Sequence, residues 1–132
     1  RSKPAAKFLE GEALRALGRW QEAIVPLSIV AAESPQRLES WLGIGWCLKR
    51  LGRLNEAIAV LEKGLVASPK QPILHYNLAC YYSLDGNAQA AVDHLTRAIA
   101  VDGRFRALIE VERDFDPIRT DPRFLQATHA SV

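Results

Sequence analysis

The chain has 132 residues, of which 48% are hydrophobic and 24% are charged, and its net charge is +2. This size and composition are typical of one soluble globular domain. The small net charge, with basic and acidic residues alternating along the sequence, argues against nucleic acid as a partner. No apolar run approaches the roughly 18 residues of a membrane span, which argues against a membrane partner.

The sequence contains no methionine and begins Arg1-Ser2-Lys3, so we expect either a fragment of a longer protein or a processed N-terminus. No signal-peptide pattern is present at the start. Two cysteines do not make a disulfide framework. Their small number favours a reducing compartment, and we predict a cytoplasmic location.

A repeat of 34 residues organises the chain. Pro35 and Pro69 lie 34 positions apart, and Gly18, Gly52 and Gly86 keep the same step. Such a period indicates stacked helical units, which offer a continuous surface for binding but no obvious catalytic cleft. The period predicts one domain, 1–132, with repeats at about 4–37, 38–71 and 72–105 and a capping segment at about 106–132.

The first repeat contains Pro26 inside its predicted second helix. A proline at this position removes a backbone hydrogen bond and is expected to kink or shorten the helix. Val30 replaces a small residue at the predicted helix crossing. We therefore predict that the first repeat is the least regular of the three.

The second and third repeats each divide into two helices with apolar residues at three- and four-residue spacings. In the second repeat, Gly52 ends the first helix and Pro69 ends the second. The third repeat follows the same plan around the turn Asp85-Gly86-Asn87. Small residues recur where the helices of a pair would cross closely. They are Gly11, Gly45 and Ala79 in the first helices and Ala23, Ala57 and Ala91 in the second helices.

After Gly103 the 34-residue register ends. Residues 105–114 have the pattern of a further helix, and residues 116–119 predict a single turn. Thr120 or Asp121 is placed to cap a last helix, with Pro122 in the favoured first position. Such a segment would close the end of a stacked array with a polar face.

These residues resemble the tetratricopeptide repeat family. Its motif is met in the second repeat by Trp41, Ile44, Gly45, Leu48, Ala57, Leu61 and Pro69. The strings GRWQEA (18–23) and GRLNEA (52–57) are similar to the inter-helix turn of bacterial members, and the resemblance covers about residues 4–103. It implies an all-α fold, namely a right-handed α-α superhelix of three helix pairs with C-terminal capping helices. Lys7 and Glu10 depart from it, because the family has apolar residues there.

In this family the first helix of each pair lines a concave surface that contacts ligands. The resemblance therefore implies a partner-binding site on the three first helices. Its predicted residues are Phe8, Glu12, Arg15, Leu42, Trp46, Lys49, Arg50, Tyr76, Asn77 and Cys80.

Trp46 is the most informative of these residues, because Trp41 already fills the aromatic position of the fold. An aromatic side chain on a binding face is a common anchor for a partner; alternatively, Trp46 packs on Tyr76, on Phe8 or under the C-terminal segment. Lys49 and Arg50 either form a solvated helix end or, with Arg15 nearby, receive an acidic partner.

One family subclass clamps the C-terminal carboxylate of heat-shock chaperones. Of the matching positions here, Asn77 alone fits that clamp, so this activity is not expected; Asn77 remains able to bind a peptide backbone.

No motif in the sequence predicts an enzyme, a cofactor or a metal site. His75, His94 and His129 lack metal-ligand spacing, and His75 is interpreted as a packing residue. Cys47 is interpreted as a buried structural thiol. Asp114, Asp116 and Asp121 lack the glycine and the glutamate of a calcium loop and suit turns and caps.

Three functions remain open. The leading one is a scaffold that binds a peptide or helix segment of another protein. The second is a structural spacer or dimerisation module whose groove holds a flanking segment of its own chain. The third is a regulatory or recruiting domain of a larger enzyme whose catalytic part is absent.

Overall fold

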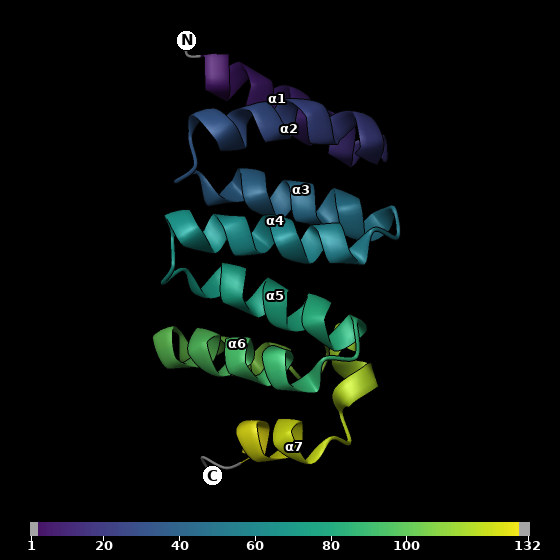
Figure 1. The fold of residues 1–132 in the computed structure, drawn as a ribbon, viewed down its shortest axis with the longest axis vertical. Coiled ribbons are helices and arrows are strands. Elements are labelled where there is room, and N and C mark those ends of the chain that lie inside the picture. Colours follow the sequence, from purple (N-terminus) through teal and green to yellow (C-terminus); the bar gives the residue numbers. More distant parts are fainter. Residues whose placement is uncertain (1–2, 130–132) are drawn as a thin grey trace. The chain divides into compact units, whose positions relative to one another are not determined.

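The computed structural model describes residues 3–129 and contains helices but no strand in that range. Six α-helices form three consecutive pairs, followed by two short 3₁₀ helices and a last α-helix (Figure 1). Their bounds are α1 Lys3–Ala16, α2 Trp20–Glu33, α3 Leu38–Arg50, α4 Leu54–Ala67, α5 Pro72–Leu84, α6 Ala88–Val101, η1 Gly103–Leu108, η2 Arg113–Ile118 and α7 Pro122–His129. The prediction of an all-α fold built from three helix pairs is confirmed. Within residues 3–129, no helix is long and apolar enough to cross a membrane.

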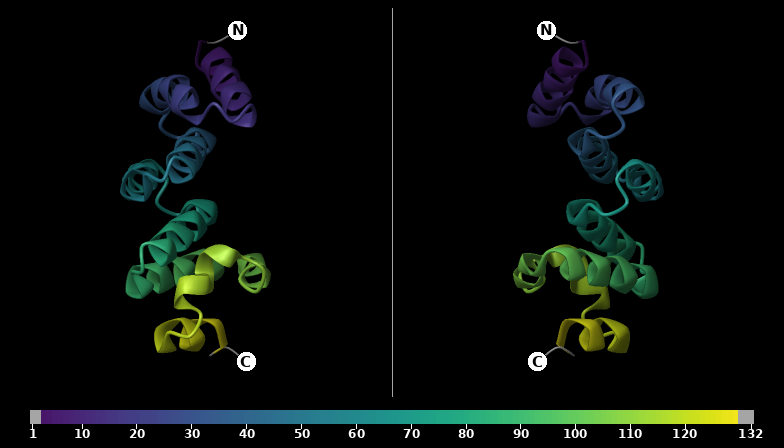
Figure 2. Two further views of the ribbon diagram at one scale, coloured as in Figure 1. Left: turned by 90° about the vertical axis from the view of Figure 1, so that its right-hand side faces the viewer. Right: turned by 90° about the vertical axis from the view of Figure 1, so that its left-hand side faces the viewer.

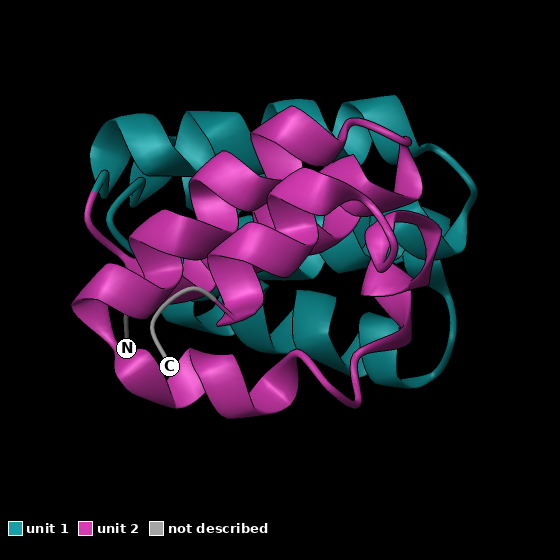
Figure 3. Ribbon diagram, turned by 90° about the horizontal axis from the view of Figure 1, so that it is seen from below, with its two compact units in different colours: residues 1–69 teal, residues 70–132 magenta. Residues whose placement is uncertain are grey.

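The helices group into two compact units, Arg1–Pro69 and Lys70–Val132 (Figure 3). In the first unit α1 packs on α2, α2 on α3 and α3 on α4. In the second unit α5 packs on α6 and on η2, and α6 also contacts η1 and α7. Figure 2 shows the helices of each pair side by side. The prediction that residues 1–132 form one domain stays a prediction.

The three turns within the pairs have one design. Gly18, Gly52 and Gly86 have φ values of 76°, 77° and 80°, a left-handed conformation that side chains disfavour. At the second turn the Arg53 N–H donates to the Leu48 carbonyl at 2.8 Å, which closes the end of α3. The predicted helix ends at these glycines are confirmed.

Replacing Gly52 with alanine is expected to lower the free energy of unfolding by about 1 kcal/mol, because alanine strains the left-handed backbone. A Cβ atom at Gly52 would meet nothing within 4 Å, so the substitution introduces no steric clash and tests only the strain in the backbone conformation. Gly52→Asn should lose less, since asparagine tolerates this conformation better. Urea denaturation checks both variants, and an alanine variant as stable as the parent chain would contradict this explanation.

Pro26 does not shorten its helix. α2 has 14 residues, as do α4 and α6, and the Gly18 turn matches the other two turns. Pro26 and Leu27 are both buried, and the apolar surface that they bury offsets the missing hydrogen bond. In helix length and turn geometry the first repeat is as regular as the others, contrary to our expectation.

Close helix packing in the first unit depends on small residues. A Cβ atom at Gly11 would lie 2.6 Å from Cγ of Leu27, and one at Gly64 would lie 2.9 Å from Cγ of Trp41. Real side chains do not approach so closely. Gly11 therefore admits α2 against α1, as predicted, and Gly64 admits Trp41 against α4. The indole N–H of Trp41 donates to the Pro35 carbonyl at 2.8 Å.

The predicted helix over residues 105–114 is wrong. The chain forms η1 and η2 instead. The Asp102 carboxylate accepts the Arg104 N–H at 3.0 Å and the Glu112 carboxylate accepts the Asp114 N–H at 3.2 Å. These caps start two separate short helices in place of one long helix. Asp102 and Glu112 were not among the residues that we assigned to turns and caps. Of the three that were, Asp121 caps a helix, as described below.

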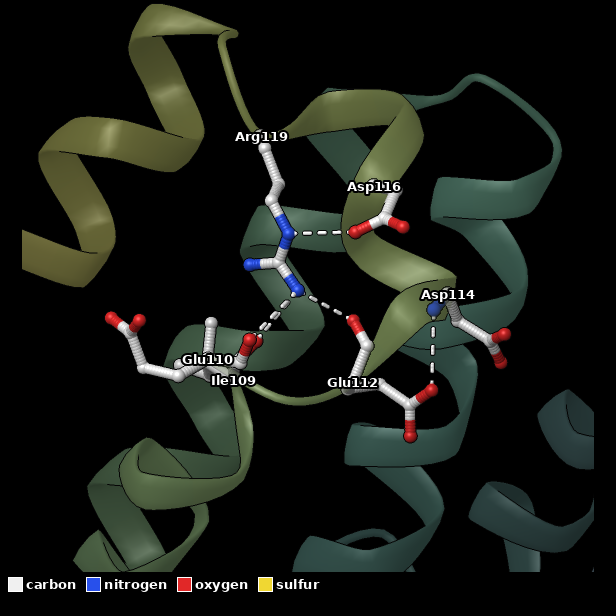
Figure 4. A network of polar contacts seen from close by, with 6 residues as sticks. All are labelled: Ile109, Glu110, Glu112, Asp114, Asp116 and Arg119. Carbon is white, nitrogen blue, oxygen red and sulfur yellow. Dashed lines mark hydrogen bonds and ion pairs between the residues drawn. The ribbon is translucent and has the colours of Figure 1, made fainter.

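Arg119 holds this segment together (Figure 4). Its Nη2 donates to the carbonyls of Ile109 at 2.9 Å and Glu112 at 2.6 Å, and its Nε donates to Asp116 at 2.8 Å. One guanidinium therefore ties the loop after η1 to the end of η2.

Replacing Arg119 with methionine keeps the apolar stem and removes these donors. We expect a loss of about 1 to 3 kcal/mol in the free energy of unfolding, the usual range for hydrogen bonds to a charged group. Arg113→Met, at an exposed position in η2, is the matched control and should change little. Thermal denaturation followed by circular dichroism compares them, and equal losses would refute the role given to Arg119.

α7 begins as predicted, with Pro122 in its first position. Asp121 caps this helix by accepting the Arg123 N–H at 2.8 Å. The Arg123 side chain and backbone N–H lower the pKa of Asp121 to about 2.

A pH dependence follows from this depressed pKa. The contribution of Asp121 to stability is present above the ordinary aspartate value near 3.9 and is lost as the pH falls toward 2. Asp121→Asn should therefore flatten the decline in stability between about pH 4 and pH 2 in an acid titration. An unchanged acid profile would show that the cap does not carry this dependence.

Candidate functional site

Seven of the ten predicted site residues lie in the first unit, on α1 and α3. Cζ of Arg37, just before α3, lies 5.1 Å from the ring centroid of Phe8 in α1. One turn further along α1, a Cβ atom at Gly43 would lie 3.2 Å from a carboxylate oxygen of Glu12. The two helices therefore run alongside each other in the same direction. We call Phe8, Glu12, Arg15, Leu42, Trp46, Lys49 and Arg50 the α1–α3 surface.

Glu12 and Arg15 neutralise each other on this surface. The guanidinium of Arg15 donates twice to the Glu12 carboxylate, at 3.2 Å and 2.7 Å. The hydrogen bonds to Glu12 raise the pKa of Arg15. The positive charge of Arg15 is thus already compensated before any partner arrives.

Trp46 is 39% exposed, a large fraction for tryptophan on a packed helix. Cζ of Arg50 lies 5.5 Å from its ring centroid and Nζ of Lys49 lies 5.6 Å from it. Arg50 is also 5.0 Å from the ring of Trp20, at the start of α2. These distances fit cation–π contacts, with one guanidinium shared by two indoles.

Trp20 and Arg37 were not among the predicted site residues. Trp20 occupies the position that Leu54 has one repeat later. This replacement of an aliphatic residue by an aromatic one was the available signal. Nothing in the repeat pattern would have placed Arg37 over Phe8.

The other three predicted residues lie in the second unit, on α5. Tyr76 is only 6% exposed, and its ring lies 5.0 Å from that of Phe105 and 5.8 Å from that of Phe115. Burial raises the pKa of Tyr76. Cys80 is buried as well, and the Asn77 amide donates to the Ile73 carbonyl at 2.9 Å. In this conformation Tyr76 and Cys80 are covered by their own chain, so their role as partner contacts stays a prediction.

The second unit also brings together two histidines that we treated as separate. His75 and His94 are buried, with their Nδ1 atoms 2.9 Å apart. One ring must donate and the other accept at that distance. The ring of Tyr82 stacks on His94 at 5.5 Å. The interpretation of His75 as a packing residue is confirmed.

No group of three or more potential metal ligands occurs within residues 3–129. Cys47 is a buried free thiol, as interpreted from the sequence, and burial raises its pKa. The neutral thiol is therefore favoured, and it is a poor nucleophile.

A family model described as tetratricopeptide repeat matches residues 14–79, half of the chain. The chain belongs to the tetratricopeptide repeat family. No curated protein matches it. The 34-residue period, the left-handed glycine turns and the small residues at helix crossings are thus features of a tetratricopeptide protein, as the motif predicted.

Several solved structures are similar to the chain. A crystal structure of MamA protein shares 25% identity, with a TM-score of 0.76, over 95% of this chain and 69% of that chain. Another MamA structure matches over 59% of its length. The Yersinia enterocolitica type III secretion chaperone SycD, in complex with a peptide of the translocator YopD, shares 15% identity, with a TM-score of 0.73, over 97% of this chain and 94% of that chain.

PcrH, in complex with the chaperone-binding region of PopB, shares 17% identity, with a TM-score of 0.67, over 94% of this chain and 90% of that chain. At such low identities SycD and PcrH show a common fold alone. The tetratricopeptide fold class is confirmed by these likenesses.

Proposed function

We propose that this tetratricopeptide protein is an interaction scaffold, without catalytic activity, that binds a peptide or helix segment of another protein on its α1–α3 surface. The exposure of Trp46 carries the proposal. A tryptophan that is 39% exposed beside two cations gives a partner both apolar contact and charge, and such residues dominate binding energy at protein interfaces.

The similar structures support the proposal. SycD and PcrH were each crystallised with a peptide or binding region of another protein. This chain has the same fold class, and its α1–α3 surface combines Phe8, Leu42 and Trp46 with charged neighbours. A protein segment is the kind of ligand that such a mixed, elongated surface fits. The cytoplasmic location and the absence of nucleic acid among the partners stay predictions.

Selection from a random twelve-residue peptide display library tests the proposal. Selected peptides should change the tryptophan fluorescence of the chain and should bind Trp46→Ala at least tenfold more weakly, as expected for an anchor residue. Val66→Ala is the matched control, because Val66 is 86% exposed and lies on α4 of the same unit. Peptides that bind both variants equally, or a failure to select any peptide, would overturn the proposal.

A second candidate role concerns the second unit. The contacts of Tyr76 with Phe105 and Phe115 show that its own C-terminal segment covers α5, which fits a structural element that closes the repeats. This role would be contradicted if selected peptides competed with that segment for Tyr76, seen as a change in the tyrosine near-ultraviolet circular dichroism.

A further inference from the structure

The geometry points to an acidic segment as the partner of the α1–α3 surface, with its carboxylates bound by Arg50 of that surface and by Arg37, which precedes α3 and lies against Phe8. This inference rests on the proposed function and adds the chemistry of the ligand. It starts from a contrast among the arginines. Six arginines each pair with a nearby carboxylate, namely Arg15, Arg19, Arg53, Arg104, Arg119 and Arg123.

Arg37 and Arg50 are different. Within residues 3–129, neither forms an ion pair, and each lies against aromatic rings instead. A guanidinium that stacks on a ring uses its flat face and keeps the N–H donors at its edge for other groups. Those edges match a carboxylate, which accepts two parallel hydrogen bonds. The two arginines thus lie against Phe8, Trp20 and Trp46, and no carboxylate within residues 3–129 pairs with them.

The charges around them favour an anion. The Glu12 carboxylate is already bound by Arg15, which leaves Glu39 as the exposed acid in the first turn of α3. The end of a helix carries about half a negative charge, so Arg50 outweighs the dipole at the end of α3. The surface therefore presents cations with apolar residues between them.

A protein segment fits better than a nucleic acid. The net charge of the chain is only +2, and nucleic-acid binding needs a larger basic face to displace counterions. A segment with a few carboxylates and apolar side chains would satisfy Arg37 and Arg50 while filling the space beside Leu42 and Trp46.

The peptides selected from the display library provide the test. We expect them to be enriched in aspartate and glutamate, to bind more weakly as salt rises, and to lose about tenfold or more in affinity to Arg37→Gln and to Arg50→Gln. Arg50→Lys should recover only part of this loss, because the lysine ammonium group lacks the planar pair of N–H donors with which a guanidinium binds both carboxylate oxygens. Arg97→Gln, at an exposed position on α6, is the matched control and should bind normally.

The outcomes separate the two proposals. Peptides that depend on Trp46 but carry no acidic excess, or that bind Arg37→Gln and Arg50→Gln normally, would overturn the acidic partner and leave the interaction surface standing. Tighter binding of single-stranded oligothymidylate than of any selected peptide would also overturn it. If no peptide depends on Trp46, both proposals fail together. Circular dichroism confirms that each variant is folded.

Discussion

Replacing Phe115 with alanine is expected to lower the free energy of unfolding of the second unit by about 3 to 5 kcal/mol. Phe115 is fully buried and lies 5.8 Å from the ring of Tyr76 and 5.6 Å from that of Phe124. Its removal leaves a cavity that these rings cannot fill without losing their contacts. Urea denaturation followed by far-ultraviolet circular dichroism measures the loss, and the tyrosine signal in the near ultraviolet should change because Tyr76 loses its cover.

Val111→Ala is the matched control for Phe115→Ala. Val111 lies between η1 and η2 and is 78% exposed, so its truncation should change stability by no more than about 0.5 kcal/mol. If both variants unfold at the same urea concentration, the C-terminal segment does not pack on α5 as described.

Replacing Leu27 with alanine is expected to cost about 2 to 5 kcal/mol in the first unit. Leu27 fills the space that Gly11 and Gly43 leave on α1 and α3, since a Cβ atom at either glycine would lie within 3.1 Å of its side chain. All three tryptophans, at positions 20, 41 and 46, belong to this unit. Their fluorescence therefore follows its unfolding in urea directly.

A second substitution at Gly11 tests this arrangement. In the parent chain, Gly11→Ala should destabilise the first unit by about 1 to 3 kcal/mol through overpacking. In the Leu27→Ala background, the added methyl group enters vacated space. The double variant should therefore lose less stability than the sum of the two single-variant losses. Ile29→Ala is the control, because Ile29 lies at an exposed position on α2, the helix that carries Leu27. Strictly additive effects would contradict direct contact between the two positions.

The repeating part of the fold could be predicted from sequence because its constraints are local. The left-handed turn at Gly52 favours glycine, and the first position of a helix favours a proline such as Pro122. Both preferences hold whatever residues surround these positions. The effect of Pro26 was misjudged for the opposite reason. A local rule predicts a kinked or shortened helix, but α2 keeps its full 14 residues, with Pro26 and Leu27 both buried.

The C-terminal segment could not be predicted in the same way. Residues 105–114 have helical spacing, yet the carboxylates of Asp102 and Glu112 compete for the backbone N–H groups, and Arg119 takes the carbonyls. The outcome depends on this competition, which the hydrophobic pattern does not contain.

Parts of the site were within reach of the sequence and parts were not. His75 lies 11 residues before Gly86 and His94 lies 8 residues after it, so an antiparallel helix pair would have placed them within about one turn of each other. The shared position of Arg50 between Trp20 and Trp46 depends on how the start of α2 meets the end of α3. This packing of two helices is a tertiary contact that the repeat pattern does not specify.

The location of a bound segment is the central claim, and nuclear magnetic resonance tests it most directly. A selected peptide is titrated into the ¹⁵N-labelled chain, and backbone amide shifts are mapped. The account predicts that the largest changes fall on α1 and α3, around Phe8, Leu42 and the indole N–H of Trp46. Changes concentrated instead on the pocket that Ser28, Ala32 and Lys63 help to line between α2, α3 and α4, or on the second unit, would contradict it.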